Sequence, residues 1–234
     1  MKQSNLIIIL LTLLLVIINI YVLYNYELPE IRWTRILSTF LLFILVIVFS
    51  GWRKGLLMAA FGLYLFSSFL SLYNEILLVR KINLGVVIII YLCLFFHVLP
   101  FLRKLKTDLF QKIIFGLIIT VNILMLFILG DLDSNRVQDI THLALLVLRG
   151  ISIIALMIMA FSLANRYTNE YSFFFLLAVL GLVFSDIFAF ISFYLREGIF
   201  VYADRFFYIL GLASLARYTI LYRNENGYKT DELF

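Results

Sequence analysis

The sequence predicts an all-α membrane protein, a polytopic bundle of about eight transmembrane helices with almost no chain outside the bilayer. Of the 234 residues, 64% are hydrophobic and only 14% are charged, whereas soluble domains are about half apolar and about a quarter charged. A soluble fold of this size cannot hide such an excess, because its surface must be polar. Only two prolines and eleven glycines interrupt the chain, so long helices can form.

Clusters of charged residues divide the chain into apolar runs of the length that a bilayer requires. A hydrocarbon core of about 30 Å needs about 20 helical residues. The first run extends from Leu6 to about Leu23, longer than the roughly 7–15 residues of a signal-peptide core, and we expect it to be retained as a span. The expected spans are 5–24, 36–51, 55–73, 84–102, 110–130, 141–164, 171–195 and 199–222.

Short connections predict one transmembrane domain over residues 1–222, in which consecutive helices are antiparallel neighbours, followed by a short cytoplasmic tail at 223–234. Arg196-Glu197-Gly198 should form a tight turn between the last two helices. A weak internal repeat relates Phe66-Ser67-Ser68 to Phe184-Ser185-Asp186. Its offset of four helices indicates two parallel four-helix halves.

The lysines and arginines predict the orientation, because cytoplasmic loops carry more of them. With both termini inside, inner segments hold ten basic residues and outer loops six. We therefore expect a multi-pass protein of a plasma or inner membrane with cytoplasmic termini. The net charge of +5 is spread over short loops beside apolar runs, which favours lipid headgroups over nucleic acid as the partner.

Cysteine and histidine are too sparse to indicate a metal site, and no cofactor is expected. The single cysteine, Cys93, lies in an apolar run and forms no CxxC motif, so we interpret it as a buried small hydrophobe. His97 and His142 are not at ligand spacing. His97 is expected to form a hydrogen bond with a neighbour inside the membrane.

Arg149 and Asp186 are the main functional candidates, because an ionisable group at the centre of a membrane helix costs about 2.5–3.5 kcal/mol. At about 1.5 Å per helical residue, the expected spans place Arg149 roughly 12 Å below the outer surface. The same rise places Asp186 roughly 13 Å below it. The two opposite charges are therefore expected at one depth on adjacent helices, where pairing would offset much of their desolvation.

Further polar residues are expected at this level, and together they would line a wet pocket open to the outer leaflet. An ion pair that only fixes helix packing is an equally open interpretation of Arg149 and Asp186. Serine and asparagine in membrane helices more often hydrogen-bond between helices, and Asp204 near the interface could simply face water. The candidates for substrate binding are Arg149, Tyr208, Ser68, Tyr91, Asn122 and Asp204.

The C-terminal third resembles the YhhN-like family of membrane lysoplasmalogenases. The residues that carry the resemblance are Gly181 to Asp186 with Ala189 and Phe193, the pair Phe207-Tyr208, and the helix from Arg149-Gly150 to Met157 and Met159. The first half departs from the family pattern, since Ser67-Ser68 stands where the family has Gly-Asp. Arg149 also replaces the family's tyrosine before glycine.

The resemblance implies a hydrolase that cleaves the vinyl ether bond of a lysophospholipid within the membrane. Asp186 would be the catalytic acid, delivering a proton to the vinyl carbon, and Arg149 would hold the phosphate. The alternative is a non-catalytic structural or accessory subunit that binds lipid or another membrane protein, including a second copy of itself. A transporter is less favoured, because the helices lack the glycine and proline breaks of transporter sites.

Overall fold

The computed structural model describes residues 2–50, 55–102, 140–167, 169–195 and 198–226, with isolated helical positions at 113, 116 and 120. These residues form seven α-helices and two short 3-10 helices. The helices are α1 (Lys2–Asn25), α2 (Leu28–Ser50), α3 (Gly55–Leu70), η1 (Ser71–Tyr73), α4 (Leu77–Val98), η2 (Leu99–Leu102), α6 (Ile140–Arg166), α7 (Glu170–Leu195) and α8 (Phe200–Asn226).

Six of the helical segments in the described part of the chain are long and apolar enough to cross a membrane. They are α1, α2, α3 with η1, α4 with η2, α6 and α7. The predicted class is confirmed: the chain is an all-α, multi-pass membrane protein. The expected span 110–130 lies outside the described residues except at the three isolated positions.

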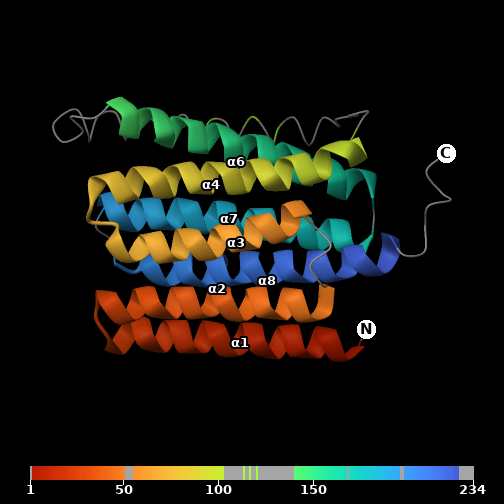
Figure 1. Ribbon diagram of the computed structural model, residues 1–234, viewed down its shortest axis with the longest axis horizontal. Helices are drawn as coiled ribbons and strands as arrows, with labels where there is room; N and C mark the ends of the chain where they lie inside the picture. Colours follow the sequence, from red (N-terminus) through yellow and green to blue (C-terminus); the bar gives the residue numbers. More distant parts are fainter. Residues whose placement is uncertain are drawn as a thin grey trace.

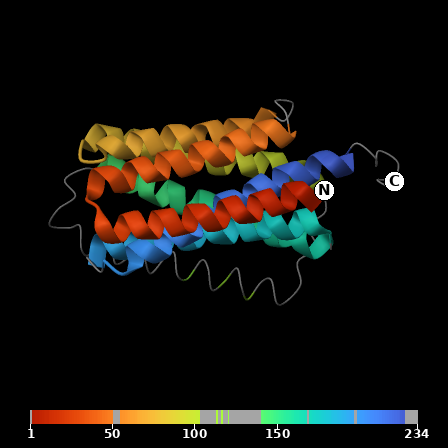
Figure 2. The ribbon, with the colours of Figure 1, turned by 90° about the horizontal axis from the view of Figure 1, so that it is seen from below.

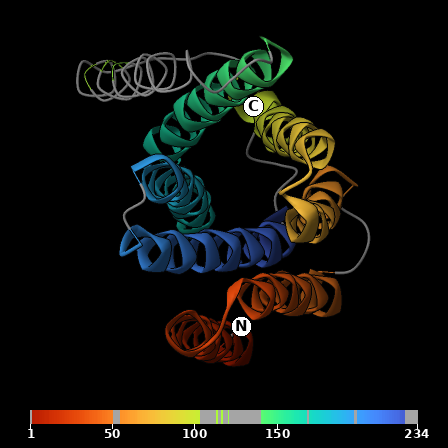
Figure 3. The same ribbon diagram turned by 90° about the vertical axis from the view of Figure 1, so that its left-hand side faces the viewer.

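α8 is missing from those six because charged Asp204, Arg205 and Arg217 interrupt its apolar sequence. It nevertheless runs the length of the bundle through its middle (Figures 1 and 3). Nearly every residue from Tyr208 to Leu221 is buried. A helix that is enclosed by protein needs no lipid-compatible surface, so its lower hydropathy is consistent with its central place.

The helices lie along one common axis and consecutive described neighbours are antiparallel (Figures 1 and 2). Contacts run in a ring from α8 to α7, α6, α4, α3, α2 and back to α8, while α1 packs outside the ring on α2 and α8. In the end-on view of Figure 3, α3, α4, α6, α7 and α8 close around the centre, and α1 and α2 lie together on the outer side of α8. Only 17% of the α1 span is buried, so α1 presents most of its apolar surface to the surroundings, as a lipid-facing helix does.

The two ends of the bundle carry different connections. At one end α1 ends and α2 begins around Tyr26, α3 meets α4, α6 begins, and α7 turns into α8 at Gly198 (Figure 1). We call this the Tyr26 end. The opposite end holds the N-terminus, η2 and the turn after Arg166, and we call it the Arg166 end.

Two helices begin about two turns earlier than the sequence predicted. α2 starts at Leu28 instead of 36, and α4 at Leu77 instead of 84. The expected outer loop at 25–35 is therefore a short turn at Tyr26. Pro29 suits a first helical turn because its missing N–H would have no intrahelical partner there, and Glu30 favours the same turn through the helix dipole.

The early starts bring basic residues of the expected loops into the helices. Arg32 and Arg35 lie in α2, and Arg80 lies in α4. Arg32 donates a hydrogen bond of 2.7 Å from Nη1 to the Leu72 carbonyl and forms an ion pair with Glu75. Long basic side chains can extend from a helix end to polar partners, which lets a helix continue past its apolar core.

Candidate functional site

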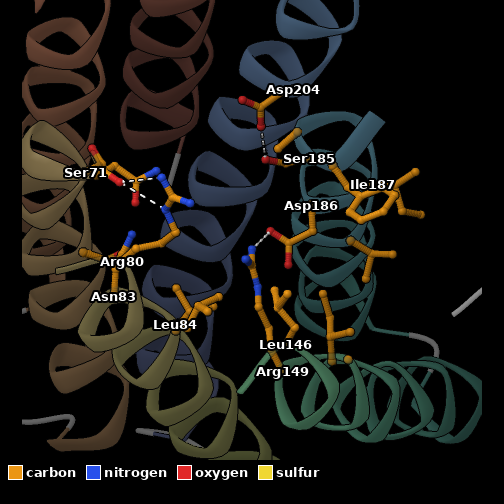
Figure 4. A pocket seen from close by; sticks show the side chains of 18 of the residues that line it. Ser71, Arg80, Asn83, Leu84, Leu146, Arg149, Ser185, Asp186, Ile187 and Asp204 are labelled. Carbon is orange, nitrogen blue, oxygen red and sulfur yellow. Dashed lines mark hydrogen bonds and ion pairs between the residues drawn. The ribbon is translucent and has the colours of Figure 1, made fainter. Parts of the chain in front are cut away.

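A cavity of about 350 Å³ lies inside the ring, towards the Tyr26 end. α2, α3, α4, α6, α7 and α8 all contribute to its wall, so it depends on the whole ring. One part of the wall is apolar, with Leu84, Val87, Ile153 and Val183 among its residues. The polar part consists of Arg35, Ser67, Ser71, Asn74, Arg80, Asn83, His142, Arg149, Ser185, Asp186 and Asp204 (Figure 4).

Asp186 accepts hydrogen bonds on both carboxylate oxygens. Arg149 on α6 pairs with Oδ1 through Nη2, and the Tyr91 hydroxyl on α4 donates to Oδ2 at 2.7 Å. The expected ion pair therefore forms, and Tyr91 joins it. Both charged side chains remain about one quarter exposed, 28% for Arg149 and 26% for Asp186, and Figure 4 shows both at the cavity wall. The pair is accessible from the cavity.

Asp204 on α8 forms the second acidic point of the wall. Its Oδ1 accepts a hydrogen bond of 2.6 Å from the Ser185 hydroxyl on α7, as Figure 4 shows. Only 7% of Asp204 is exposed. The close packing of α7 on α8 therefore encloses most of Asp204, which reaches the cavity wall.

Tyr208 and Ser68 lie together in a buried hydroxyl cluster between α8, α3 and α2. The Tyr208 hydroxyl shares hydrogen bonds with Thr39 at 2.9 Å and with Ser68 at 3.2 Å. Ser68 also donates to the carbonyl of Tyr64 at 2.9 Å. This cluster lies behind the cavity wall. Successive helical residues point about 100° apart, so Ser67, next to Ser68, lines the cavity instead.

Asn122, the remaining candidate, lies outside the described residues. The other six candidates fall into three groups. Arg149, Tyr91 and Asp186 meet at one ion pair, Asp204 meets Ser185, and Tyr208 meets Ser68. Their common level in the bundle was predictable from residue spacing, but the division into three groups was not, because it depends on how each helix is rotated about its axis.

The sequence interpretation missed several polar residues of the wall, chiefly Arg35, Arg80 and Asn83. Arg80 donates from Nε and Nη2 to the Asn74 carbonyl, at 3.1 and 3.0 Å. Asn83 accepts a hydrogen bond of 2.6 Å from Ser67. The helix-start signal at Pro29 and Glu30 could have placed Arg35 on a helix face. With three arginines and two aspartates, the lining has one excess positive charge, which suits an anionic ligand.

The Arg166 end contains an aromatic cluster around His97. Nε2 of His97 forms a hydrogen bond of 3.0 Å with the Tyr218 hydroxyl, and the imidazole packs edge-on against Tyr222 with 5.0 Å between ring centroids. The expected hydrogen bond of His97 is thus confirmed. Across the described ranges, no three His, Cys, Asp or Glu side chains gather as a metal-binding group.

Comparisons with protein-family models, curated proteins and solved structures found no match to this chain. The apolar helices establish that it is an integral multi-pass membrane protein.

Proposed function

We propose that this protein hydrolyses the vinyl ether bond of a lysophospholipid from within the membrane, as a YhhN-like lysoplasmalogenase would. The observation that carries the proposal is the accessible carboxylate of Asp186, held between Arg149 and Tyr91 at the wall of a positively charged cavity. Charged side chains in membrane helices are costly, so their convergence at a cavity favours a working site.

The cavity wall matches the two parts of a lysophospholipid. Arginine guanidinium groups recognise phosphate through paired hydrogen bonds, and three arginines reach this cavity. The apolar part of the wall suits the first carbons of a lipid chain. A volume of about 350 Å³ is at the lower end of small-ligand sites. It accommodates the headgroup region, while the long chain extends between helices into the bilayer.

The chemistry requires a proton donor and water. Protonated Asp186 gives its proton to the vinyl carbon, and the ether oxygen stabilises the resulting oxocarbenium ion. Water adds to that ion and returns one proton to the Asp186 carboxylate. The hemiacetal then breaks its bond to the glycerol oxygen, which takes up the proton lost by the hemiacetal hydroxyl, and gives an aldehyde and a glycerophospho-alcohol. Positioned acids of this kind accelerate reactions by about 10²–10⁴-fold.

The ion pair sets a condition on this reaction, because Asp186 must first acquire a proton while it faces Arg149. We infer that the phosphate competes for Arg149 when the lipid enters, leaving Oδ1 free to be protonated. Tyr91 remains on Oδ2 and keeps the carboxyl group oriented. The headgroup would thus help to prepare the acid that acts on the neighbouring ether.

The test is aldehyde release from lysoplasmalogen by the purified protein in detergent micelles. We expect wild type to release aldehyde and Asp186→Asn to be at least about 100-fold slower, in keeping with the loss of a general acid. Glu27→Gln, a change at an exposed carboxylate of the Tyr26 end, is the matched control and should keep the wild-type rate. The hydrolase proposal fails if folded wild type releases no aldehyde or if Asp186→Asn retains its rate.

The ion pair itself favours a second candidate, a non-catalytic subunit that binds an anionic lipid. Asp186 has both oxygens engaged, which is the arrangement of a structural charge pair. Such a protein would bind lysophospholipid and release no aldehyde. Binding without release in the same preparation would favour this candidate over the hydrolase.

We also propose that the Tyr26 end faces outward, as the distribution of basic residues predicts. Single cysteines in a Cys93→Ala background test this with a membrane-impermeant maleimide on intact cells. Ile199→Cys, at an exposed position of the Tyr26 end, should be labelled. Asn169→Cys, at an exposed position of the Arg166 end, should be labelled only after lysis. The reverse pattern would overturn the orientation.

A further inference from the structure

Ser67 on α3 and Asn83 on α4 form a hydrogen-bonded pair in the wall of the cavity. The Ser67 hydroxyl donates to Oδ1 of Asn83 at 2.6 Å, and both residues line the cavity. A hydrogen bond between two membrane helices can serve packing alone. This pair, however, faces the cavity and keeps hydrogen-bonding capacity that the contact between the helices does not use.

The unused capacity consists of one donor group and one acceptor. An asparagine amide has an acceptor oxygen and a nitrogen with two hydrogens, and here Ser67 occupies the oxygen. The amide nitrogen, Nδ2, has no hydrogen-bond partner among the described residues, and it is not enclosed by protein. The Ser67 hydroxyl gives its hydrogen to Asn83, so its oxygen can still accept one.

A hydroxyl group is the ligand group that complements this pair. It accepts a hydrogen bond on its oxygen and donates its own hydrogen, so it can bind Nδ2 of Asn83 and the Ser67 oxygen together. A phosphate oxygen has no hydrogen for Ser67, and an ammonium group has no acceptor for Asn83. Arg80, about one helical turn before Asn83, also lines the cavity and repels a ligand cation.

Helix α4 fixes the position of the pair relative to the reacting group. Asn83, Val87 and Tyr91 follow one another at four-residue spacing, so they share one face of the helix. Asn83 and Val87 line the cavity, and Tyr91 donates to Asp186. Asn83 lies about two turns before Tyr91, and the side chain of a helical residue leans back towards the helix N-terminus. Figure 4 shows Asn83 across the pocket from Asp186.

We propose that Ser67 and Asn83 form a hydroxyl-binding subsite that recognises the free glycerol hydroxyl of a lysophospholipid. The proposal rests on the proposed function, in which the ether lies at Asp186 and the phosphate at Arg149. In a lysophospholipid the free hydroxyl branches from the carbon between those two groups. A second acyl chain on that oxygen removes the hydrogen that Ser67 accepts and adds bulk. The subsite therefore selects lysophospholipids over lipids with two chains.

The test compares two ligands that differ only in this hydroxyl. They are a saturated alkyl-ether lysophosphatidylcholine and its 2-deoxy analogue, in which hydrogen replaces the hydroxyl. The rise in Tm of the purified protein with ligand concentration gives an apparent affinity for each. We expect wild type to prefer the hydroxyl lipid by about tenfold or more, because the deoxy lipid leaves the polar groups of the pair without a partner.

Asn83→Leu keeps the approximate size of the side chain and removes the amide. This variant should bind both lipids with nearly the same affinity, so the preference of wild type is lost. The matched control is Asn25→Leu, which removes an exposed amide of the Tyr26 end that bonds the Tyr21 carbonyl, and it should keep the preference. If Asn83→Leu does not fold, Ser67→Ala removes the acceptor and should also reduce the preference.

A preference that persists in the folded Asn83→Leu variant would overturn the subsite and leave the pair as a contact between α3 and α4. Equal affinity of wild type for the two lipids, or no response to either, would overturn it as well. Neither lipid has a vinyl ether, so this test needs no hydrolysis. Asp186→Asn should keep the preference while losing aldehyde release, so failure of the subsite and failure of the hydrolase proposal are distinguishable.

Discussion

Gly181 on α7 and Gly211 on α8 meet backbone to backbone at the crossing of the two helices. A Cβ atom at Gly181 would lie 2.7 Å from the Gly211 Cα and 3.0 Å from the Phe207 carbonyl oxygen. Only glycine allows this approach. The crossing lies one helical turn from Ser185, so it also sets the distance at which Ser185 reaches Asp204.

Gly181→Ala should therefore destabilise the bundle by about 1–3 kcal/mol, the usual range for overpacking. The clash is with backbone atoms, which can yield only if α7 and α8 separate. Gly62→Ala is the control, since a Cβ at Gly62 would have no described atom within 4 Å, and alanine favours helix. Thermal unfolding in detergent compares the two. Equal melting temperatures would contradict the close crossing.

Ser185→Ala should lower the stability by about 1–3 kcal/mol, because it leaves a buried carboxylate oxygen of Asp204 without its donor. The control is Ser152→Ala, because the Ser152 hydroxyl donates to the Leu148 carbonyl of its own helix and the loss of such a bond should cost less. The measurement is the shift in Tm for each variant. A smaller shift for Ser185→Ala than for Ser152→Ala would show that the contact with Asp204 matters little.

Tyr218→Phe should remove the hydrogen bond to His97 and cost about 0.5–1.5 kcal/mol. Since this contact lies at the Arg166 end, lysophospholipid affinity should stay at the wild-type value. Tyr167→Phe is the comparison. The hydrogen bond from Tyr167 to the Phe101 carbonyl is long, at 3.5 Å, so its removal should lower the stability less than Tyr218→Phe does. Reduced lipid affinity in Tyr218→Phe would argue against separate structural and binding ends.

The contact between Arg32 and Glu75 should make stability depend on pH. The Arg32 guanidinium donates a hydrogen bond to the Glu75 carboxylate, and this contact lowers the pKa of the Glu75 carboxyl below its ordinary value. A lowered pKa in the folded state means that the stabilisation is complete above the ordinary value, 4.5, and is lost as the pH falls through the lowered one. The Tm difference between wild type and Glu75→Gln should follow this course. A difference that persists unchanged in acid would contradict the contact.

The membrane class was predictable because it depends on composition and on the lengths of apolar runs. The residues at which the helices begin were less predictable, because an apolar run marks the part of a helix that faces lipid and not the whole helix. α2 and α4 begin before their apolar runs, and these added helical turns place Arg35 and Arg80 at the cavity wall. The central place of α8 was also hidden, since its charged residues are tolerated only because other helices enclose it.

The ion pair of Arg149 and Asp186 was predictable from depth, because adjacent antiparallel helices bring equal depths together. Rotation about each helix axis was not predictable in the same way. It decides that Ser67 rather than Ser68 lines the cavity, and that the Tyr208 ring stacks against the Arg35 guanidinium from behind the wall. Arg205 on α8 is buried, and its Nε and Nη1 have no hydrogen-bond partner among the described residues. This burial depends on packing between helices that are far apart in the sequence, which no local sequence pattern reveals.

A structure of the protein bound to a saturated alkyl-ether lysophospholipid tests the central claim most directly. The saturated ether has no vinyl carbon to protonate, so the complex should persist. We expect the phosphate to lie in the cavity within hydrogen-bond distance of Arg149, and the first chain carbons to lie beside Asp186. A lipid bound on the outer surface with its phosphate away from the cavity would contradict the account.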